Sequence, residues 1–375
     1  MRERVLAAVH GLTSPRCGFV YDLAVLREQV GKVRSAFGGA TVLYAMKANS
    51  HPAVVAALSG LCDGLDVASA GELELALAVG ARRIVVSGPA KTDALLRAAV
   101  AAGAQINVES AHELRRLPPG AKVAIRVNRT GAALAGSHAM TGAPTQFGVD
   151  EDELPAVLAL AAAEGVDVLG FHLHAVSNNL DAAAHARFVA DALAWSATQP
   201  VDLRLVNVGG GLGVDHLSAA TIDLDALREA LPAPRPGVEL IVEPGRILAA
   251  DAGYYAAEVI DLKRSHGRWF AVLRGGTHHF RLPAAWGYSH PFDIVPVDEW
   301  PYPFPRPTVE EAEVDVAGEL CTPRDVLARG RHVRRLRAGD VLVFGRAGAY
   351  GWDISHHDFL RHPHPEVIVL GPAGS

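Results

Sequence analysis

From residue 41 to about residue 250 the chain alternates between two kinds of sequence. Short stretches that are apolar at nearly every position are separated by longer stretches rich in alanine and leucine. Continuous apolarity is typical of parallel strands covered on both faces, whereas the longer stretches suit helices. The pattern predicts strands at 41–46, 65–69, 83–87, 105–109, 122–128, 168–175, 204–208 and 239–243, and helices at 71–80, 92–102, 153–164, 182–198 and 223–231. Eight successive strand–helix units favour a (β/α)8 TIM barrel over an open doubly wound sheet.

After about residue 253 the pattern changes. Helical stretches nearly vanish, prolines cluster between residues 283 and 307, and apolar pieces recur at 256–262, 269–273, 313–318, 340–344 and 366–370. These features predict a second, all-β domain at the C-terminal end. Residues 19–29 read as a strand that runs into a helix, so we expect the N-terminus to join that domain. The predicted division is a barrel over 25–253 and a β domain made of 1–24 together with 254–375.

Polar residues end the predicted barrel strands, where (β/α)8 enzymes place their working groups. In chain order these residues are Lys47, Ser69, Ser87, Glu109, Arg126, His174, Gly209–Gly211 and Glu243. The connection over 129–149 is long and rich in glycine, alanine and threonine, which indicates a functional loop. A lysine, a histidine, three glycines and a glutamate at one end of a barrel favour a reaction centre over chance.

Lys47 follows an apolar, β-branched run and is followed by small polar residues. Such a lysine is either a solvated charge at the rim or an amine in a pocket. Burial would lower the pKa of the amine, and a neutral amine can form a Schiff base with an aldehyde cofactor.

Two glycine-containing segments follow the last predicted strands. Gly209–Gly211 would let backbone amides approach an anion without interference from Cβ atoms, although a tight turn explains the run equally simply. Glu243 ends the eighth strand, and Arg246 follows a Pro-Gly turn that would aim it at a phosphate. An acidic group that faces a pyridine nitrogen keeps it protonated and makes the ring an electron sink. The alternative for this turn is an ordinary surface corner.

Composition narrows the class of protein. The chain has 375 residues, half of them apolar, and a net charge of −6, so two folded domains are expected and no basic stripe points to nucleic acid or an anionic membrane. No apolar run is long enough for a membrane span, and the N-terminus lacks the apolar core of a signal peptide. Three scattered cysteines suit reduced thiols, and we therefore expect a cytoplasmic protein.

Seven segments occur in an order that characterises one enzyme family. They are YAMKAN at 44–49, LDVASAGE at 65–72, GFHLHAVS at 170–177, GGG at 209–211, EPGR at 243–246, GELCTPRD at 318–325 and GAY at 348–350. On these segments, which span nearly the whole chain, it resembles the fold-type III decarboxylases that use pyridoxal 5'-phosphate (PLP), the family of diaminopimelate and ornithine decarboxylases. The resemblance implies an alanine-racemase-like fold.

The resemblance also implies roles for individual residues. Lys47 would hold PLP covalently, His174 would stack on its ring, and Glu243 would pair with its pyridine nitrogen. The residues expected around the phosphate are Ser177, Gly209, Gly210, Gly211, Gly245, Arg246 and Tyr350. Cys321 would protonate the carbon that loses CO2, acting from the neighbouring subunit of a homodimer. Without the resemblance, Cys321 would be read as a small buried apolar residue.

Departures from the family pattern bear on the substrate. Val176 replaces the usual glycine before the phosphate-binding serine, and Gln146 replaces a frequent lysine. Thr322 stands where the two named relatives carry an acidic residue that meets a distal substrate amine. A cationic diamine is therefore disfavoured, and a neutral or anionic distal group is expected.

The segment 274–286 resembles a subgroup of these enzymes found in siderophore biosynthesis, some of which act on an amino acid joined to citrate. On this resemblance His278, His279 and Arg281 would bind substrate carboxylates together with Thr322; packed or solvated histidines are the alternative. The histidine-rich run 355–364 has no convincing ligand spacing, so no metal is expected.

Three other functions remain open at this point. The chain could decarboxylate free diaminopimelate or another free amino acid. An amino-acid racemase shares the fold, but it gains from a poor electron sink, which Glu243 does not provide. A PLP-carrier protein would be a bare barrel without the β domain and Cys321. Release of CO2 separates decarboxylation from both of the last two functions.

Overall fold

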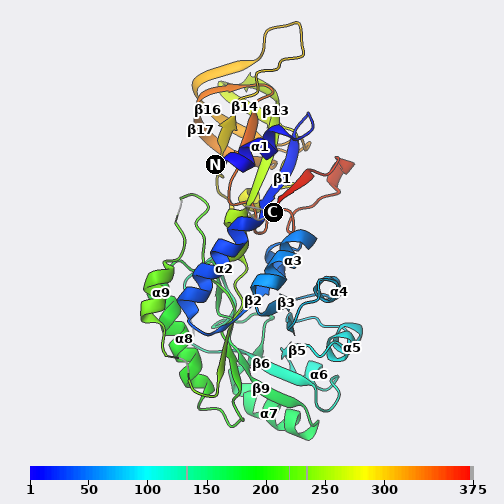
Figure 1. Cartoon of the computed structure of the whole chain (residues 1–375), viewed down its shortest axis with the longest axis vertical. Helices are drawn as coiled ribbons and strands as arrows, with labels where there is room; N and C mark the ends of the chain where they lie inside the picture. Colours follow the sequence, from blue (N-terminus) through cyan, green and yellow to red (C-terminus); the bar gives the residue numbers. More distant parts are fainter. Residues whose placement is uncertain (132–133, 219, 234, 372–375) are drawn as a thin grey trace. The chain divides into compact units, whose positions relative to one another are not determined.

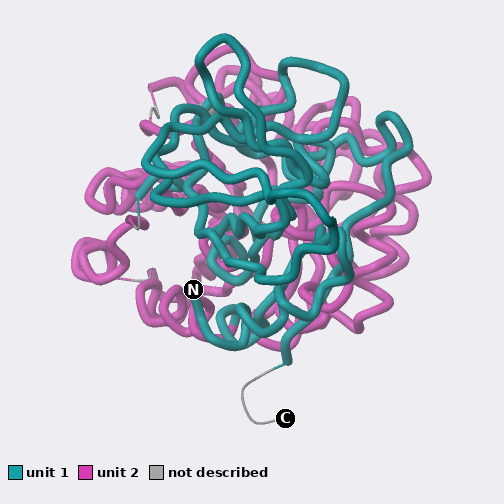
Figure 2. Tube along the Cα trace, turned by 90° about the horizontal axis from the view of Figure 1, so that it is seen from above, with its two compact units in different colours: residues 1–26, 216–219, 249–375 teal, residues 27–215, 220–248 magenta. Residues whose placement is uncertain are grey.

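The computed structural model describes residues 1–131, 134–218, 220–233 and 235–371. The chain forms two compact units (Figure 2). One unit, called the barrel unit below, comprises residues 27–215 and 220–248. The other, called the β unit, comprises residues 1–26, 216–219 and 249–375, of which the described part ends at residue 371. No helix within the described residues is long and apolar enough to cross a membrane.

The barrel unit contains a closed ring of eight parallel strands, as the sequence predicts. The strands are β2 (Thr41–Ala45), β3 (Gly64–Val67), β4 (Ile84–Val86), β5 (Gln105–Val108), β6 (Lys122–Asn128), β9 (Asp167–His172), β11 (Leu205–Asn207) and β12 (Glu239–Val242). Each pairs with the next, and β12 pairs with β2 to close the ring. Leu43, Val85, Ala124 and Leu205 come from alternate strands and form one buried layer inside the barrel. A (β/α)8 barrel is filled in this way because inward side chains of alternate strands reach the same height.

Helices of the barrel unit connect successive strands (Figure 1). They are α2 (Leu23–Phe37, which begins in the β unit), α3 (Pro52–Leu61), α4 (Ala70–Ala78), α5 (Asp93–Ala101), α6 (Ala111–Leu114), α7 (Leu154–Ala163), α8 (Ala182–Ser196), α9 (Leu224–Ala230) and α10 (Arg246–Ala249), which extends one residue into the β unit. Several begin at a polar residue that caps the helix: the Ser69 hydroxyl accepts the backbone N–H of Glu72, and Thr92 and Asp181 cap α5 and α8. Ser69 therefore serves as a cap, which satisfies a backbone donor at a helix start.

The β unit is built around one eight-stranded sheet. Its strands are β1 (Cys17–Asp22), β13 (Gly253–Ser265), β14 (Arg268–Leu273), β15 (Asp293–Val295), β16 (Thr308–Ala317), β17 (Val326–Arg337), β18 (Val341–Phe344) and β19 (Glu366–Leu370). Strand β1 pairs with both β13 and β19, so the N-terminal segment does belong to this sheet. Two short helices, α1 (Glu3–His10) and α11 (Leu282–Trp286), complete the unit.

The sequence pattern misses α1, α11, β15 and β17 of the β unit, and the reasons are clearest for β17 and α1. Strand β17 carries five arginines among its twelve residues, and they hide its alternation because only a few positions, such as Leu327 and Val333, are buried. Helix α1 has only 8 residues, and of these only Val5 and Val9 are buried. A pair of apolar residues at i and i+4 is too weak a signal to predict a helix.

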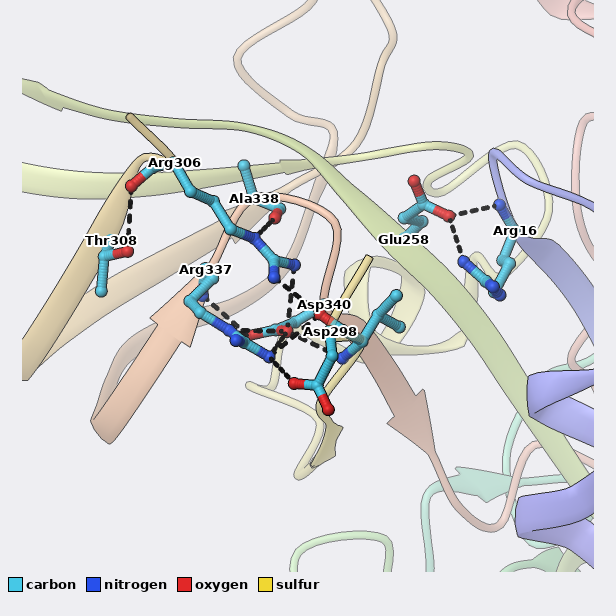
Figure 3. Close-up of polar contacts among 9 residues, drawn as sticks. Arg16, Glu258, Asp298, Arg306, Thr308, Arg337, Ala338 and Asp340 are labelled. Atoms are coloured by element: carbon cyan, nitrogen blue, oxygen red, sulfur yellow. Dashed lines mark hydrogen bonds and ion pairs between the residues drawn. The ribbon is translucent and has the colours of Figure 1, made fainter. Parts of the chain in front are cut away.

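A buried carboxylate organises the proline-rich part of the β unit (Figure 3). Asp340 accepts hydrogen bonds from the backbone N–H of Val297 at 3.1 Å and from the Arg337 side chain at 2.9 Å, and it pairs with Arg306 at 3.3 Å. Nearby, Glu258 accepts the backbone N–H and the guanidinium of Arg16. A buried charge needs such partners, because they offset the free-energy cost of removing the charge from water.

Candidate active site

Glu243 lies just after β12, at the carboxyl end of the barrel, and is held from two sides. The Asn207 amide donates to Glu243 Oε1 at 2.6 Å, and His172 Nε2 lies 3.3 Å from Glu243 Oε2. All three side chains are buried. Burial by itself would raise the pKa of this carboxyl, but the imidazole of His172 and the Asn207 amide outweigh it and lower the pKa from 4.5 to about 2. Glu243 is therefore an ionised carboxylate in a desolvated site.

Asp66 is a second carboxyl at this end of the barrel, and the sequence analysis gives it no role. Ser87 donates to Asp66 Oδ1 at 2.6 Å, and Asn107 donates to Ser87 at 3.0 Å. Burial and the charge of Glu243 raise the pKa of Asp66 well above its usual range. Two neighbouring carboxyls are thus driven to opposite states, Asp66 neutral and Glu243 ionised, which is typical of sites that use proton transfer or fixed charge.

The loop Gly209–Gly211 packs between two of the predicted site elements. A Cβ on Gly209 would overlap the His174 ring, and a Cβ on Gly210 would overlap the carbonyl of Glu243. The backbone N–H of Gly209 donates to Asn207 Oδ1 at 2.8 Å, and that of Gly210 donates to His174 Nδ1 at 3.1 Å. Two of the three amides expected to face an anion therefore have acceptors within the protein. The loop fixes the ring of His174 and, through Asn207, the carboxylate of Glu243.

His174 is suited to stacking rather than to carrying charge. Desolvation and the charges of Lys47 and Arg126 lower its pKa well below the usual value, so its ring is neutral. Its ring lies 6.3 Å from that of His172 at an interplanar angle of 17°. A flat, neutral ring held by a backbone amide can pack on an aromatic ligand without a desolvation penalty for charge.

Lys47 lies in a short 3-10 turn, Met46–Ala48, directly after β2. Its neighbours Met46 and Ala48 are buried, whereas Lys47 itself is exposed. The exposure of Lys47 in the single chain therefore agrees with a charge at the rim rather than with a buried amine. Its charge nevertheless acts on both Asp66 and His174, which places the amine at the same end of the barrel as the Glu243 cluster.

Glu109 and Arg126 brace the neighbouring loops. Arg126 donates to Glu109 Oε1 at 2.9 Å and lies 4.6 Å from the centroid of the Phe147 ring. Glu109 also accepts the backbone N–H groups of Gly88 and Gly148. The Glu109 carboxylate therefore holds together the loops that follow three different strands.

Ser177 lies in the two-residue strand β10 (Val176–Ser177), which pairs with β7 (His138–Ala139) of the long connection.

Gly245 and Arg246 follow Glu243 in the barrel unit. Gly245 packs against the backbone and side chain of Ala45 and against Ala48, leaving no room for a Cβ. Arg246 is buried at the start of α10. The barrel unit thus contains most of the predicted cofactor residues: Lys47, His174, Ser177, Gly209, Gly210, Gly211, Glu243, Gly245 and Arg246. Tyr350, Cys321, Thr322, His278, His279 and Arg281 belong to the β unit.

Cys321 is exposed, which excludes the interpretation as a buried apolar residue. Its loop is held by the fully buried Asp325. Asp325 accepts the backbone N–H of Thr277 at 2.7 Å and that of Leu320 at 2.8 Å. The Thr322 hydroxyl accepts the backbone N–H of Arg324 at 3.3 Å. A loop with this many internal hydrogen bonds presents its thiol in a fixed position.

His278 and His279 do not face solvent. Both are fully buried, and their rings lie 3.9 Å apart. Burial lowers the pKa of His279 to about 2, and its Nδ1 lies 3.4 Å from the thiol of Cys17. A neutral, buried imidazole cannot offer a charge to a carboxylate, so packing explains His279 better than substrate binding. No set of three metal-ligating side chains occurs in the described part of the chain, which includes the histidine run.

Arg281 and Thr322 line a cavity of about 690 Å³ that is contained in the β unit. Its walls come from α11 and the following turn, from the Cys321 loop and the start of β17, and from His356 and Phe359. None of the residues lining this cavity is acidic. Arg281 and Thr322 are both predicted substrate-binding residues, and the fold places them in the same cavity lining.

The end of the barrel fits PLP by its own chemistry. It combines the amine of Lys47, a neutral ring at His174, an ionised carboxylate at Glu243, and a glycine loop that admits no Cβ atoms. His172 is buried, its Nε2 lies 3.3 Å from Glu243 Oε2, and within the described residues its Nδ1 makes no hydrogen bond. A carboxylate kept ionised in this setting suits a protonated pyridine nitrogen.

Comparison with known proteins agrees with this chemistry. Residues 23–250 match the family model described as pyridoxal-dependent decarboxylase, pyridoxal binding domain. A 2-[(L-alanin-3-ylcarbamoyl)methyl]-2-hydroxybutanedioate decarboxylase from Staphylococcus aureus is 40% identical, covering 98% of this chain and 97% of the relative. Diaminopimelate decarboxylase from Deinococcus radiodurans is 35% identical over 94% of this chain and 90% of its own.

Solved structures are similar as well. Diaminopimelate decarboxylase from Helicobacter pylori, complexed with L-lysine, has a TM-score of 0.79 at 26% identity and covers 95% of this chain and 91% of its own. Diaminopimelate decarboxylase from M. jannaschii has a TM-score of 0.83 at 25% identity and covers 97% of this chain and 88% of its own.

Proposed function

The chain belongs to the family of PLP-dependent decarboxylases, and on that premise we propose that it removes CO2 from an amino acid joined to citrate, in siderophore biosynthesis. The observation that carries the proposal is the buried, ionised Glu243 beside Asn207 and His172. A carboxylate at the pyridine end favours a deep electron sink, as decarboxylation requires and racemisation does not.

Each site residue then has a task. When bound, PLP withdraws electrons from the carbon that loses CO2. Lys47 Nζ would hold the cofactor and later accept its return from the product amine. Glu243 would keep the pyridine nitrogen protonated, His174 would pack on the ring, and Arg246 with Ser177, Gly211 and Tyr350 would surround the phosphate. The exposed Cys321 Sγ would donate the proton that replaces CO2.

The substrate is proposed from two observations. The relative that is 40% identical is named for a compound in which alanine is joined at C3, through an amide, to a hydroxybutanedioate. Thr322 in this chain offers no charge to a distal amine. Free diaminopimelate remains the alternative, because the diaminopimelate decarboxylase from Deinococcus radiodurans is 35% identical.

Assembly and location are part of the same proposal. A homodimer would let Cys321 of one copy serve the barrel of the other and would cover its exposed thiol. The three free cysteines suit a reducing compartment, and we propose the cytoplasm. The barrel over 25–253 would bind the cofactor, and the β domain, 1–24 with 254–375, would complete the active site.

A substrate screen tests this proposal. Protein loaded with PLP is incubated with citryl-conjugated diaminopropionate, citryl-conjugated serine, and free diaminopimelate, lysine and ornithine, and CO2 release is followed by mass spectrometry of the products. We expect loss of CO2 from a conjugate alone. Turnover of a free amino acid alone would overturn the substrate assignment.

Lys47→Ala provides the matched control for the screen. It should abolish turnover and, after borohydride reduction, should also remove the mass of covalently attached cofactor. Retained turnover in Lys47→Ala would contradict the role of this lysine.

A further inference from the structure

The cavity of the β unit contains three arginines in its lining. Besides Arg281, its lining includes Arg324 from the Cys321 loop and Arg329 from strand β17. All three arginines are exposed. With no acidic side chain in the lining, the cavity has a net positive charge.

The guanidinium groups of these arginines make few interactions with other described residues. Among the described residues, the guanidinium groups of Arg281 and Arg324 have no side-chain or backbone acceptor, and Arg329 has one distant partner, Asp315 at 3.9 Å. That carboxylate already accepts from Arg268 at 2.5 Å and from the backbone N–H of Gly330 at 2.8 Å. A structural role for the arginines would require partners, so their charge is available to a ligand.

The walls that present these arginines are fixed. Ser289 lines the cavity, and its hydroxyl accepts the backbone N–H of Arg329 at 2.9 Å. The backbone N–H of His290 donates to the carbonyl of Leu327 at 3.0 Å, which joins the turn after α11 to the start of β17. On the other side, the Thr322 hydroxyl accepts the backbone N–H of Arg324. When charged groups are carried by rigid elements, binding a ligand costs little conformational entropy of the protein.

We propose that this cavity is the binding site for the hydroxydicarboxylate head of the substrate, and that Arg324 and Arg329, with Arg281, determine specificity for it. The inference rests on the proposed function and adds the residues that recognise the citrate part. Guanidinium groups bind carboxylates through paired, charge-assisted hydrogen bonds, so an anionic head would match three arginines. The hydroxyls of Thr322, Ser289 and Tyr288 in the same lining suit the hydroxyl of that head.

Kinetics of single variants test the assignment. Arg324→Gln and Arg329→Gln, loaded with PLP, are compared with the wild type on the citryl conjugate. We expect each to raise KM about ten- to a hundredfold with little change in kcat, because each loses one charge-assisted contact remote from the reacting carbon. Arg334→Gln, an exposed arginine on the same strand outside the cavity lining, is the matched control and should leave KM unchanged. An unchanged KM in both cavity variants would overturn the inference.

A binding measurement separates this inference from the proposed function. Calorimetry with citrate as the probe should show binding to PLP-loaded wild type and to Arg334→Gln. The two cavity variants should bind citrate with a dissociation constant that is about tenfold higher or more. Turnover of the conjugate by the wild type, with full citrate binding by both variants, would refute the cavity and leave the proposed function standing. No turnover of the conjugate, with citrate binding that depends on Arg324 and Arg329, would refute the proposed function and support an anion site. A changed oligomeric mass in the variants without a changed citrate affinity would assign the cavity to a subunit interface and overturn the inference.

Discussion

At the scale of single residues, the state of Glu243 depends on one neighbour that the sequence did not single out. His172 approaches Glu243 Oε2 at 3.3 Å and, together with the Asn207 amide, outweighs the effect of burial on the pKa of Glu243. Because the pKa of Glu243 in the fold is about 2, below its ordinary value of 4.5, its contribution to stability is complete above pH 4.5 and is lost as the pH falls toward 2. The carboxylate is therefore ionised throughout the neutral range.

Replacing His172 should reverse this balance. In His172→Leu, burial of Glu243 is no longer opposed by the imidazole, so its pKa should rise. The absorbance of bound cofactor should then change with pH in a range where the wild type is constant, and kcat should fall first at the acidic end. A pH titration of the cofactor spectrum measures this effect.

His185→Leu supplies the control for that titration. His185 is also buried, and burial lowers its pKa to about 4, but it lies on α8. It should leave the cofactor titration unchanged. Restored wild-type behaviour in His172→Gln would indicate that a hydrogen-bond donor suffices, whereas an unchanged titration in His172→Leu would contradict the role of His172.

At the scale of elements, the loop Gly209–Gly211 couples the two ends of the cofactor site. Asn207 joins the Gly209 amide to Glu243, and Gly210 holds the ring of His174. The loop therefore sets the position of the stacking ring and of the carboxylate together. Its glycines are required by close approach as well as by conformation, since Gly209 has φ +67° and faces the His174 ring.

Gly209→Ala should weaken PLP binding strongly, about a hundredfold, because the new Cβ must displace the His174 ring, which on our proposal would pack on the cofactor. Fluorescence titration of the apoprotein with PLP measures the dissociation constant. Gly103→Ala is the matched control: its φ is +68°, but nothing lies within 4 Å of the added Cβ. Both variants carry a similar backbone strain of about 1 kcal/mol or more, so only a difference in PLP affinity supports the packing role.

At the scale of the whole molecule, the exposed thiol of Cys321 supports the proposed homodimer. Proton donors act best where water is excluded, yet this thiol is exposed in the single chain. A dimer with shared sites would cover it. Lys47 and Cys321 belong to different units of the chain, so a variant at one residue leaves the unit that holds the other residue intact.

Mixing two inactive variants tests shared sites. Lys47→Ala and Cys321→Ala, each nearly inactive alone, should regain about a quarter of wild-type activity when unfolded and refolded together in equal amounts, because half of randomly formed dimers carry one intact site of two. Ultracentrifugation of the same mixture gives the oligomeric mass. Absence of any recovery in a properly formed dimer would show that Cys321 serves its own chain or no site.

The sequence by itself determined the fold class and the order of the barrel strands. Covered parallel strands must be apolar throughout, and this requirement leaves a local pattern, as in Val42 to Ala45 and Ile84 to Val86. Polar residues at strand ends, such as Lys47 and Glu243, were visible for the same reason. Strand β17 was not, because arginines at its exposed positions break the apolar pattern on which strand prediction depends.

Only the tertiary structure decided which side chains act on one another. His172 and Asn207 come from two strands, and their effect on Glu243 arises from short distances that no sequence spacing encodes. Glu243 in turn raises the pKa of Asp66, which lies on a third strand. Burial was likewise a tertiary property: His279 is buried and Lys47 is exposed, and the sequence around them indicated neither. Ionisation depends on desolvation and on charges nearby in space, so the chemistry of this site follows from the fold rather than from any single motif.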